Sequence, residues 1–252
     1  MYYKENLGYV YPDRSDEHML KVKHLVDTNF DENFQYLPKS FWYKVKRVLL
    51  WIALNTFVFA VCCNLIHGLK IYGKENIKKH KKLLKNGAIT ICNHVFMLDY
   101  LCVLKAIRPH LEYMPGWKTN FEGSNRHFIR LVGGIPIPTD NARAMVKFKR
   151  SIDEVLENGK WLHFYPEGSM WFYYPDIRPL KPAVFKFAVA HNKPVIPLAI
   201  SYRPRKGLYK IYKKKPCVDI HIGEPLIPDT SLCPADAVKK MHKDAYQPCW
   251  NR

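Results

Sequence analysis

Short apolar runs alternate with helical segments over residues 88–202, and this alternation constrains the fold more than any other feature of the chain. Uninterrupted apolar runs predict buried strands at 88–92, 161–165 and 195–202. Apolar residues at helical spacing predict helices at 98–107, 141–158 and 183–191. Strands that alternate with helices form parallel sheets covered by those helices. We therefore predict an α/β fold with a largely parallel sheet flanked by helices.

Further elements are expected around this core: strands at 134–138, 208–212 and 218–222, and a closing helix at 234–246. Asp140 is the expected N-cap of the helix at 141–158, because its short carboxylate can accept from the first free N–H groups. Gly159 is the expected stop of the same helix.

Polar motifs follow two of the predicted strands. Asn93, His94 and Asp99 lie just beyond the first strand, and Glu167 and Gly168 lie just beyond the second. The carboxyl ends of parallel strands meet at one edge of an open sheet, where ligands usually bind. We therefore expect both motifs to line one site.

His94 and Asp99 are five residues apart, a spacing that does not share one face of a regular helix. They can meet only if the chain turns between them, as it does where a strand leads into a helix. An imidazole can accept a hydroxyl proton near neutral pH, and a carboxylate on its second nitrogen fixes the tautomer. The pair is a candidate general base; taken alone, it could also be an ordinary hydrogen-bonded histidine.

Four motif blocks, in order, resemble the glycerolipid acyltransferase family, typified by 1-acylglycerol-3-phosphate acyltransferases. The family's Asn-His-x-x-x-x-Asp block stands here as Asn93, His94 and Asp99. Its second block opens at Lys118 and closes with the Gly-x-Ile-x-Ile-like stretch at 134–138. Its Phe-Pro-Glu-Gly-Thr-Arg-Ser block reads Tyr165-Pro166-Glu167-Gly168-Ser169-Met170-Trp171, and its apolar Val-Pro-Val-x-Pro-Val strand lies at 194–200. The segment at 180–186 resembles the family's Lys-x-Gly-Ala segment, so that the resemblance spans roughly residues 70–225.

The resemblance implies an enzyme that moves a fatty acyl group from acyl-coenzyme A or acyl carrier protein to a lysophospholipid hydroxyl in phospholipid biosynthesis. It implies catalysis by His94 and Asp99. No covalent acyl-enzyme is expected, because no cysteine or serine has the local arrangement that would favour one. We expect no metal and no cofactor beyond the acyl donor. The candidate substrate-binding residues are Glu167, Gly168, Lys118, Lys181, Arg178 and Arg143.

Two arginines that the family associates with the acceptor phosphate are missing here. Asp140 is not followed by arginine in the second block, and Met170 stands where the third block usually has arginine. Methionine cannot bind phosphate bidentately as a guanidinium does. The phosphate-binding charge would have to come from displaced residues, namely Arg143, Arg178, Lys118 and Lys181. The sequence therefore supports the reaction better than the acceptor.

The chain is strongly basic, with a formal net charge of +18 over 252 residues. Such a charge implies an anionic partner, for which a membrane surface or a phosphorylated thioester carrier are candidates. We expect no nucleic acid, because zinc-ligand spacing, an RNA-binding signature and a helix-turn-helix pattern are absent from the sequence. The seven cysteines are scattered and form no Cys-x-x-Cys pair, which predicts reduced thiols and no metal site.

Residues 48–66 form a nineteen-residue stretch without charge, about long enough to cross a bilayer core. Cations flank it on both sides, which favours a helix or hairpin that dips into the membrane or lies in the interface over a single span. A core helix of a soluble fold is the alternative. We predict a membrane-associated segment at 41–69, followed by an acyltransferase domain at 70–252 whose active site faces the cytoplasm.

Residues 1–40 show no recognisable chemistry and contain Pro12 and Pro38 as breakers. A short helix is expected at 18–26. We interpret the segment as an N-terminal extension, with a packing arm or lid over the catalytic domain as the alternative.

Three functions remain open from the sequence. The first is a membrane-associated acyltransferase that acts on a lysophospholipid or related glycerolipid. The second is an acyltransferase of the same fold that acts on a different alcohol, such as a glycan or a secondary metabolite. The third is a non-enzymatic basic protein that binds membranes or nucleic acid. The presence of His94, Asp99 and Glu167 together argues against the third.

Overall fold

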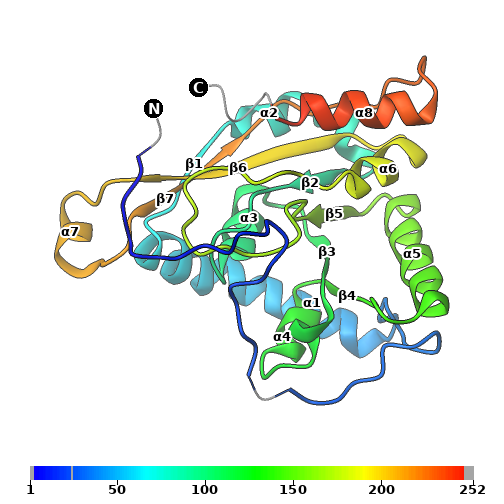
Figure 1. Cartoon of the computed structure of the whole chain (residues 1–252), viewed down its shortest axis with the longest axis horizontal. Coiled ribbons are helices and arrows are strands. Elements are labelled where there is room, and N and C mark those ends of the chain that lie inside the picture. Colours follow the sequence, from blue (N-terminus) through cyan, green and yellow to red (C-terminus); the bar gives the residue numbers. More distant parts are fainter. Residues whose placement is uncertain (1–2, 24, 247–252) are drawn as a thin grey trace.

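The computed structural model describes residues 3–23 and 25–246, and one seven-stranded sheet with helices on both faces forms its centre (Figure 1). The strand order is β1-β7-β6-β2-β5-β3-β4. Neighbouring strands are parallel throughout, except that β6 and β7 are antiparallel. The largely parallel α/β sheet predicted from the alternating pattern is confirmed.

The strands are β1 (Lys70–Tyr72), β2 (Ile89–Ile91), β3 (Glu112–Trp117), β4 (Gly134–Ile137), β5 (Trp161–Phe164), β6 (Val195–Arg203) and β7 (Cys217–Ile222). The α-helices are α1 (Phe41–Ala53), α2 (Lys74–Lys79), α3 (Asp99–Ala106), α4 (Arg126–Leu131), α5 (Ala142–Glu157), α6 (Ala183–Ala190), α7 (Leu208–Tyr212) and α8 (Pro234–Asp244). The π-helix η1 (Leu54–Ile66) continues α1, and η2 (Leu83–Asn86) and η3 (Lys118–Phe121) are short 3₁₀ helices.

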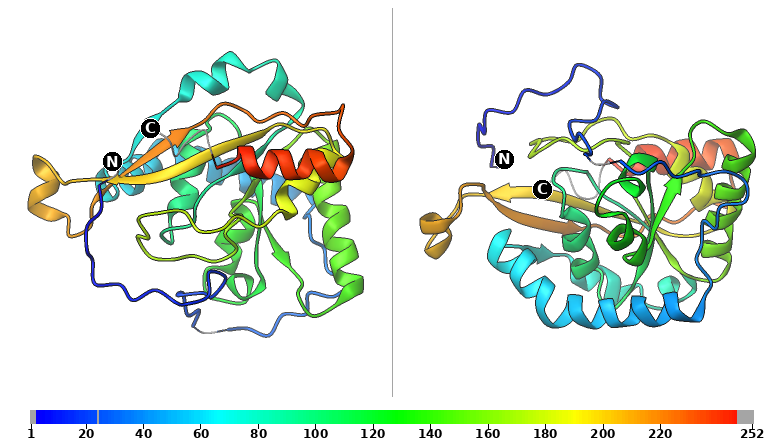
Figure 2. Two further views of the ribbon diagram at one scale, coloured as in Figure 1. Left: turned by 45° about the horizontal axis from the view of Figure 1, so that its top comes forward. Right: turned by 90° about the horizontal axis from the view of Figure 1, so that it is seen from below.

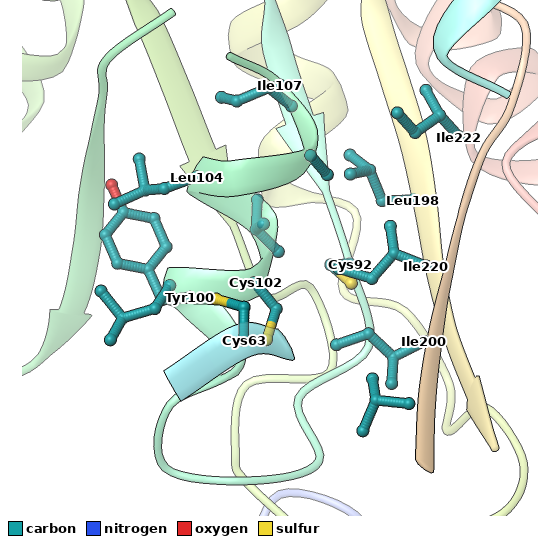
Figure 3. Close-up of a cluster of buried hydrophobic side chains, with 14 of the residues drawn as sticks. Cys63, Cys92, Tyr100, Cys102, Leu104, Ile107, Leu198, Ile200, Ile220 and Ile222 are labelled. Atoms are coloured by element: carbon teal, nitrogen blue, oxygen red, sulfur yellow. The ribbon is translucent and has the colours of Figure 1, made fainter. Parts of the chain in front are cut away.

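Each face of the sheet carries an apolar layer. On one face, α3 and η1 pack against β6 and β7; Figure 3 shows Cys102 of α3 beside Cys63 of η1, with Leu198 and Ile200 of β6 in the same cluster. On the other face, α5, α6 and α8 cover the central strands. The central strands are therefore buried on both sides, which explains their uninterrupted apolar sequences.

Three local predictions are wrong. Leu208–Tyr212 is helix α7 and not a strand, because it lies in the connection beyond the last β6–β7 pair and follows Gly207, whose φ is +56°. The described residues of 18–26 form no helix; the Val26 N–H instead donates to the Glu122 carbonyl. The N-cap of α5 is Asn141, whose side chain accepts from two backbone N–H groups of the first turn.

Helices α1 and η1 form one continuous helix, Phe41–Ile66, that lies along the side of the molecule below the sheet in Figure 2, right. By length and composition it could cross a membrane, the one such helix among residues 3–23 and 25–246. Only 17% of its most apolar window is buried. This exposure argues against the core helix of a soluble fold, since a core helix buries its apolar side chains.

We define residues 3–23 as the N-terminal strap. It runs over the rest of the chain without regular secondary structure (Figure 1). Lys4 forms an ion pair with Asp176 at 2.6 Å, and Tyr11 stacks on Trp171 with ring centroids 5.6 Å apart. The Tyr11 hydroxyl donates to the Phe172 carbonyl. Residues 3–23 are therefore packed against the rest of the molecule, as the alternative of a packing arm implies.

Candidate active site

Asn93 lies two residues beyond the end of strand β2 and fixes where the first motif begins. Its side-chain amide donates to the Ile200 carbonyl at 3.0 Å, and its side-chain oxygen accepts from the Ile200 N–H at 2.7 Å. The side chain thus pairs with β6 as one more peptide group would. The chain is then free to turn away from the sheet at His94, directly at the carboxyl edge.

His94 and Asp99 meet through a tight turn between β2 and α3. His94 Nδ1 lies 2.7 Å from Asp99 Oδ2, and the same oxygen accepts from the backbone N–H groups of Val95 (2.8 Å) and Phe96 (3.2 Å). Asp99 is the first residue of α3, so its carboxylate folds back over the turn that precedes it. The predicted meeting of the two side chains where a strand leads into a helix is present in the structure.

The surroundings of Asp99 hold it as a carboxylate beside the imidazole. Its side chain is fully buried, whereas the His94 side chain is 24% exposed. Burial raises the pKa of Asp99, but the charge of His94, the bonds from His94 and Tyr165 and the Val95 N–H outweigh it and leave the pKa below its ordinary value. The Nδ1–H of His94 then donates to Asp99, and Nε2 remains as the basic nitrogen.

Tyr165 contacts both members of the pair. Its hydroxyl donates to Asp99 Oδ1 at 2.7 Å, and its ring stacks on the His94 imidazole with centroids 3.9 Å apart. The phenylalanine typical of this position in the third block has no hydroxyl. Tyr165 therefore adds a hydrogen bond to Asp99 that the usual residue cannot make.

Glu167 is buried and binds the backbone N–H of His94. Its Oε2 accepts from the His94 N–H at 3.0 Å and from the Arg178 guanidinium at 2.6 Å, and its Oε1 accepts from the Arg178 N–H at 2.9 Å. Burial raises the pKa of Glu167, and the adjacent Arg178 charge opposes that rise. Both side chains of the pair are at most 2% exposed. Arg178 is thus bound to Glu167 and Ser169 inside the protein.

Gly168 and Lys181 lie against each other beside this ion pair. Gly168 has φ +83°, and a Cβ there would come within 2.6 Å of Lys181 Nζ and 2.9 Å of its Cε. A side chain at position 168 would therefore be strained and would displace Lys181. Lys181 is exposed, so its ammonium group is accessible to an anion at the edge of the site.

The structure brings together six of the predicted site residues: His94, Asp99, Glu167, Gly168, Arg178 and Lys181. Lys118 instead pairs with Asp140 at the end of β3. Arg143 lies 3.8 Å from Glu32 and is 85% exposed. Among the interactions of the described residues, none joins Lys118 or Arg143 to His94.

The N-terminal strap covers the third motif block through its backbone. These contacts were not predicted from the sequence. The Ser15 carbonyl accepts from Ser169 Oγ at 3.0 Å and from Arg178 at 2.7 Å. The Glu17 carbonyl accepts from the Trp171 indole N–H at 2.9 Å. Because the strap binds through backbone carbonyls, its side chains gave no signal for these contacts.

His18, at the end of these contacts, lies over the same edge of the sheet. Its ring stacks on Trp117 with centroids 4.2 Å apart. Burial, followed by the charges of His94, Lys181 and Arg178, lowers the pKa of His18. His18 is therefore a neutral side chain near the candidate base that the sequence motifs did not include.

Behind Tyr165 lies a second buried polar cluster. The Thr90 hydroxyl donates to Glu112 Oε2 at 2.7 Å and lies 2.8 Å from His163 Nδ1. Burial raises the pKa of Glu112 to about 8 and lowers the pKa of His163 to about 3. His163 packs edge-on against Tyr165 at 4.4 Å, so the cluster supports the ring on which His94 stacks. The sequence signal for this cluster is that each of its three polar residues stands in a largely apolar strand.

The model of a family described as Acyltransferase matches residues 68–201, more than half of the 252 residues. The chain belongs to the acyltransferase family. The family and the enzyme class predicted from the order of the motif blocks are confirmed. A search of curated proteins gave no match.

The fold of this acyltransferase is similar to the crystal structure of the 1-acyl-sn-glycerophosphate (LPA) acyltransferase PlsC from Thermotoga maritima. The TM-score is 0.52 and the sequence identity 19%, and the match covers 86% of each chain. At this identity the similarity shows the fold.

The described part of the acyltransferase holds no group of three or more His, Cys, Asp or Glu side chains suited to a metal ion. Cys62, Cys63, Cys102, Cys217 and Cys233 are free cysteines, and Cys249 lies outside the described residues. The chemistry that the site itself supports is that of an oriented imidazole. His94 can take a proton at Nε2 while Asp99 stabilises the resulting imidazolium.

Proposed function

We propose that this acyltransferase moves a fatty acyl group from acyl-coenzyme A or acyl carrier protein to a lysophospholipid hydroxyl, that of 1-acylglycerol-3-phosphate, in phospholipid biosynthesis. The observation that carries the proposal is the bonded pair of His94 and Asp99 at the carboxyl edge of a parallel sheet. The acceptor named for the structurally similar PlsC supports the choice of acceptor.

The proposed reaction is a direct transfer. His94 Nε2 removes the proton of the acceptor hydroxyl, and the oxygen attacks the carbonyl carbon of the thioester. A new C–O bond forms, the C–S bond breaks, and the imidazolium returns its proton to the thiolate. The products are an ester and a free thiol. Asp99 stabilises the imidazolium in both half-steps.

Glu167 and Arg178 are proposed to act as positioning residues. The bond from the His94 N–H to Glu167 fixes the backbone of the base, and Arg178 neutralises the buried carboxylate. In the sequence we expected both to bind the acceptor. Their burial supports a role through His94, and Lys181 beside Gly168 is the better candidate for an acceptor anion.

A second candidate acceptor is an alcohol without phosphate. Met170 occupies the place of the family's arginine and is 3% exposed, and Arg178 is bound inside the protein. Few cations are then left at the site to bind a phosphate group. Lys181 favours the phosphate acceptor, and the absence of the arginine favours the alternative.

We further propose that the enzyme works at an anionic bilayer on its cytoplasmic side. The mostly exposed apolar helix Phe41–Ile66 and the net charge of +18 support this placement. Cations on both sides of the helix favour an interfacial helix over a single span.

Replacing His94 with Ala tests the reaction. In detergent micelles with labelled acyl donor, His94→Ala is expected to lose acyl transfer by a factor of about 10²–10⁴, because the base is gone. Its thermal melt should match that of the wild type. His127→Ala, at an exposed histidine of α4, is the control and should keep full activity. Activity of His94→Ala equal to that of His127→Ala would rule out the assignment.

An acceptor screen separates the two candidate functions. Thiol release from acyl-coenzyme A is measured with lysophosphatidic acid and with matched uncharged monoacylglycerol. A preference for lysophosphatidic acid that Lys181→Met removes supports the phosphate acceptor. A preference for the uncharged alcohol supports the second candidate.

A further inference from the structure

The connection between β6 and β7 ends in an exposed apolar tip. Helix α7 projects from the end of this hairpin, away from the sheet, in Figures 1 and 2. Leu208 is 75% exposed and Ile211 82% exposed. The two residues are three apart and share one face of α7. Large apolar side chains at this exposure, side by side on one tip, indicate a contact surface.

A neighbouring face of α7, which carries Tyr209 and Tyr212, is bound to the end of the apolar helix. The Tyr209 hydroxyl donates to the Asn64 carbonyl at 2.9 Å, and the Tyr212 hydroxyl donates to the Leu65 carbonyl at 2.8 Å. Lys213 donates to the Ile66 carbonyl. These carbonyls belong to the last turn of η1, where a helix has no partners of its own. Helix α7 is therefore fixed next to the apolar helix.

The exposed apolar surfaces of the two helices adjoin. Leu65 is 57% exposed and Ile66 48% exposed, and both lie where α7 is attached. Leu208 and Ile211 thus extend the exposed apolar surface of Phe41–Ile66 beyond its end. An occupant that covers one of these surfaces meets the other.

The charge of this tip indicates what kind of surface it binds. Residues 205–215 contain six cations and no acidic residue, and Lys206, Lys210 and Lys214 are exposed. Basic side chains around an apolar tip match the phosphate groups and acyl chains of an anionic membrane surface. A protein partner would need an acidic rim around an apolar pocket, whereas a second copy of this chain would bring a formal net charge of +18 to a basic tip.

We propose that α7 is a second bilayer-contact element, which places Leu208 and Ile211 among lipid acyl chains while Lys206, Lys210 and Lys214 bind anionic headgroups. The inference rests on the proposed membrane association of the helix Phe41–Ile66. It adds a contact that fixes how the molecule is turned on the membrane, because two separate contacts restrict rotation about the helix axis.

Vesicle sedimentation of the full chain tests this. Two vesicle types are used, phosphatidylcholine alone and phosphatidylcholine with phosphatidylglycerol. The double variant Leu208→Ser/Ile211→Ser is expected to bind both types about tenfold more weakly than the wild type. The triple variant Lys206→Gln/Lys210→Gln/Lys214→Gln should lose affinity for the anionic vesicles and keep its affinity for phosphatidylcholine.

A matched triple variant on α8, Lys239→Gln/Lys240→Gln/Lys243→Gln, removes the same charge from exposed positions elsewhere. It should bind anionic vesicles within about twofold of the wild type, since only charges near the surface contribute. Circular dichroism melts confirm that all variants are folded. Equal losses for both triple variants, or wild-type binding by the double variant, would overturn the proposal.

Acyl transfer in detergent micelles keeps this test separate from that of the reaction. If the enzyme is active in micelles and the α7 variants bind vesicles like the wild type, the α7 contact is overturned and the proposed reaction still holds. Absence of acyl transfer overturns the reaction, whatever the vesicles show. Wild-type protein that binds neither vesicle overturns the membrane association and the α7 contact together. A dimer in analytical ultracentrifugation that the double variant dissociates, with vesicle binding unchanged, identifies the tip as a self-association surface instead.

Discussion

Tyr165 shows how one hydroxyl changes a motif built around a histidine. The carboxylate of Asp99 accepts from His94, from two backbone N–H groups and from Tyr165, so its charge is shared among four donors. Each added donor stabilises the carboxylate and leaves less of its charge for the imidazolium. Tyr165 should therefore tune the base without touching the substrate.

The variant Tyr165→Phe tests this at residue scale. Without the hydroxyl, Asp99 stabilises the imidazolium more strongly, and the acidic limb of kcat/KM should move to higher pH by about half a unit to one unit. The pH–rate profile in micelles measures the shift. Tyr72→Phe, at an exposed strand residue of β1, should leave the profile unchanged. A lower kcat with an unshifted acidic limb would assign Tyr165 a packing role only.

At the scale of elements, the N-terminal strap holds the third block through both backbone carbonyls and side-chain contacts. Its carbonyls at Ser15 and Glu17 bind Ser169, Arg178 and Trp171. Tyr11 provides the aromatic contact that holds it there. It stacks on Trp171, meets Tyr174 edge-on and donates to a backbone carbonyl.

Tyr11→Ala should release the strap and leave the sheet folded. Loss of two ring contacts and one hydrogen bond removes roughly 2–4 kcal/mol from the strap's attachment. Limited proteolysis with mass spectrometry should show cleavage within residues 3–23 at least tenfold faster than in the wild type, at an unchanged rate elsewhere. Tyr246→Phe, whose hydroxyl binds the Leu180 N–H on another face, is the control. Equal cleavage rates in Tyr11→Ala and the wild type would contradict this account.

For the whole molecule, the buried cluster behind the site makes stability depend on pH. The pKa of Glu112 is about 8 in the folded chain, against an ordinary value of 4.5. Between these values the folded state holds a proton that the unfolded state has released, so stability falls as pH rises from 4.5 to 8. The pKa of His163 is lowered to about 3, so its contribution is lost in the opposite direction, as pH falls below 6.5.

Glu112→Gln isolates the first effect. Glutamine resembles the protonated acid, so the melting temperature should match that of the wild type near pH 5. At pH 8 the variant should melt several degrees higher, at about 2–4 °C per kcal/mol. Melts from pH 5 to 8 measure the gap, with the exposed Glu157→Gln as the control. A gap that stays constant over this range would contradict the shifted pKa.

The parallel sheet and the meeting of both motifs could be predicted, because apolar runs mark buried strands and the carboxyl ends of parallel strands share an edge. The hydrogen bonds between Asn93 and Ile200 could not be predicted, because they depend on the register in which β6 pairs with β2. The bond between Arg178 and Glu167 could not be predicted either, because an arginine eleven residues after Glu167 reaches it only through the fold of the intervening loop. The five-residue run at α7 is too short for its periodicity to separate helix from strand.

The strap has a consequence for the order of assembly. Two of its contacts, Ser15 with Ser169 and Lys4 with Asp176, join residues 154 and 172 positions apart. Closing so long a loop costs entropy that only a finished partner surface can repay. As the chain is synthesised, the helix Phe41–Ile66 and strand β2 emerge long before residues 169–178 exist. The strap must therefore wait, and the third motif block becomes covered only in the last stage of folding.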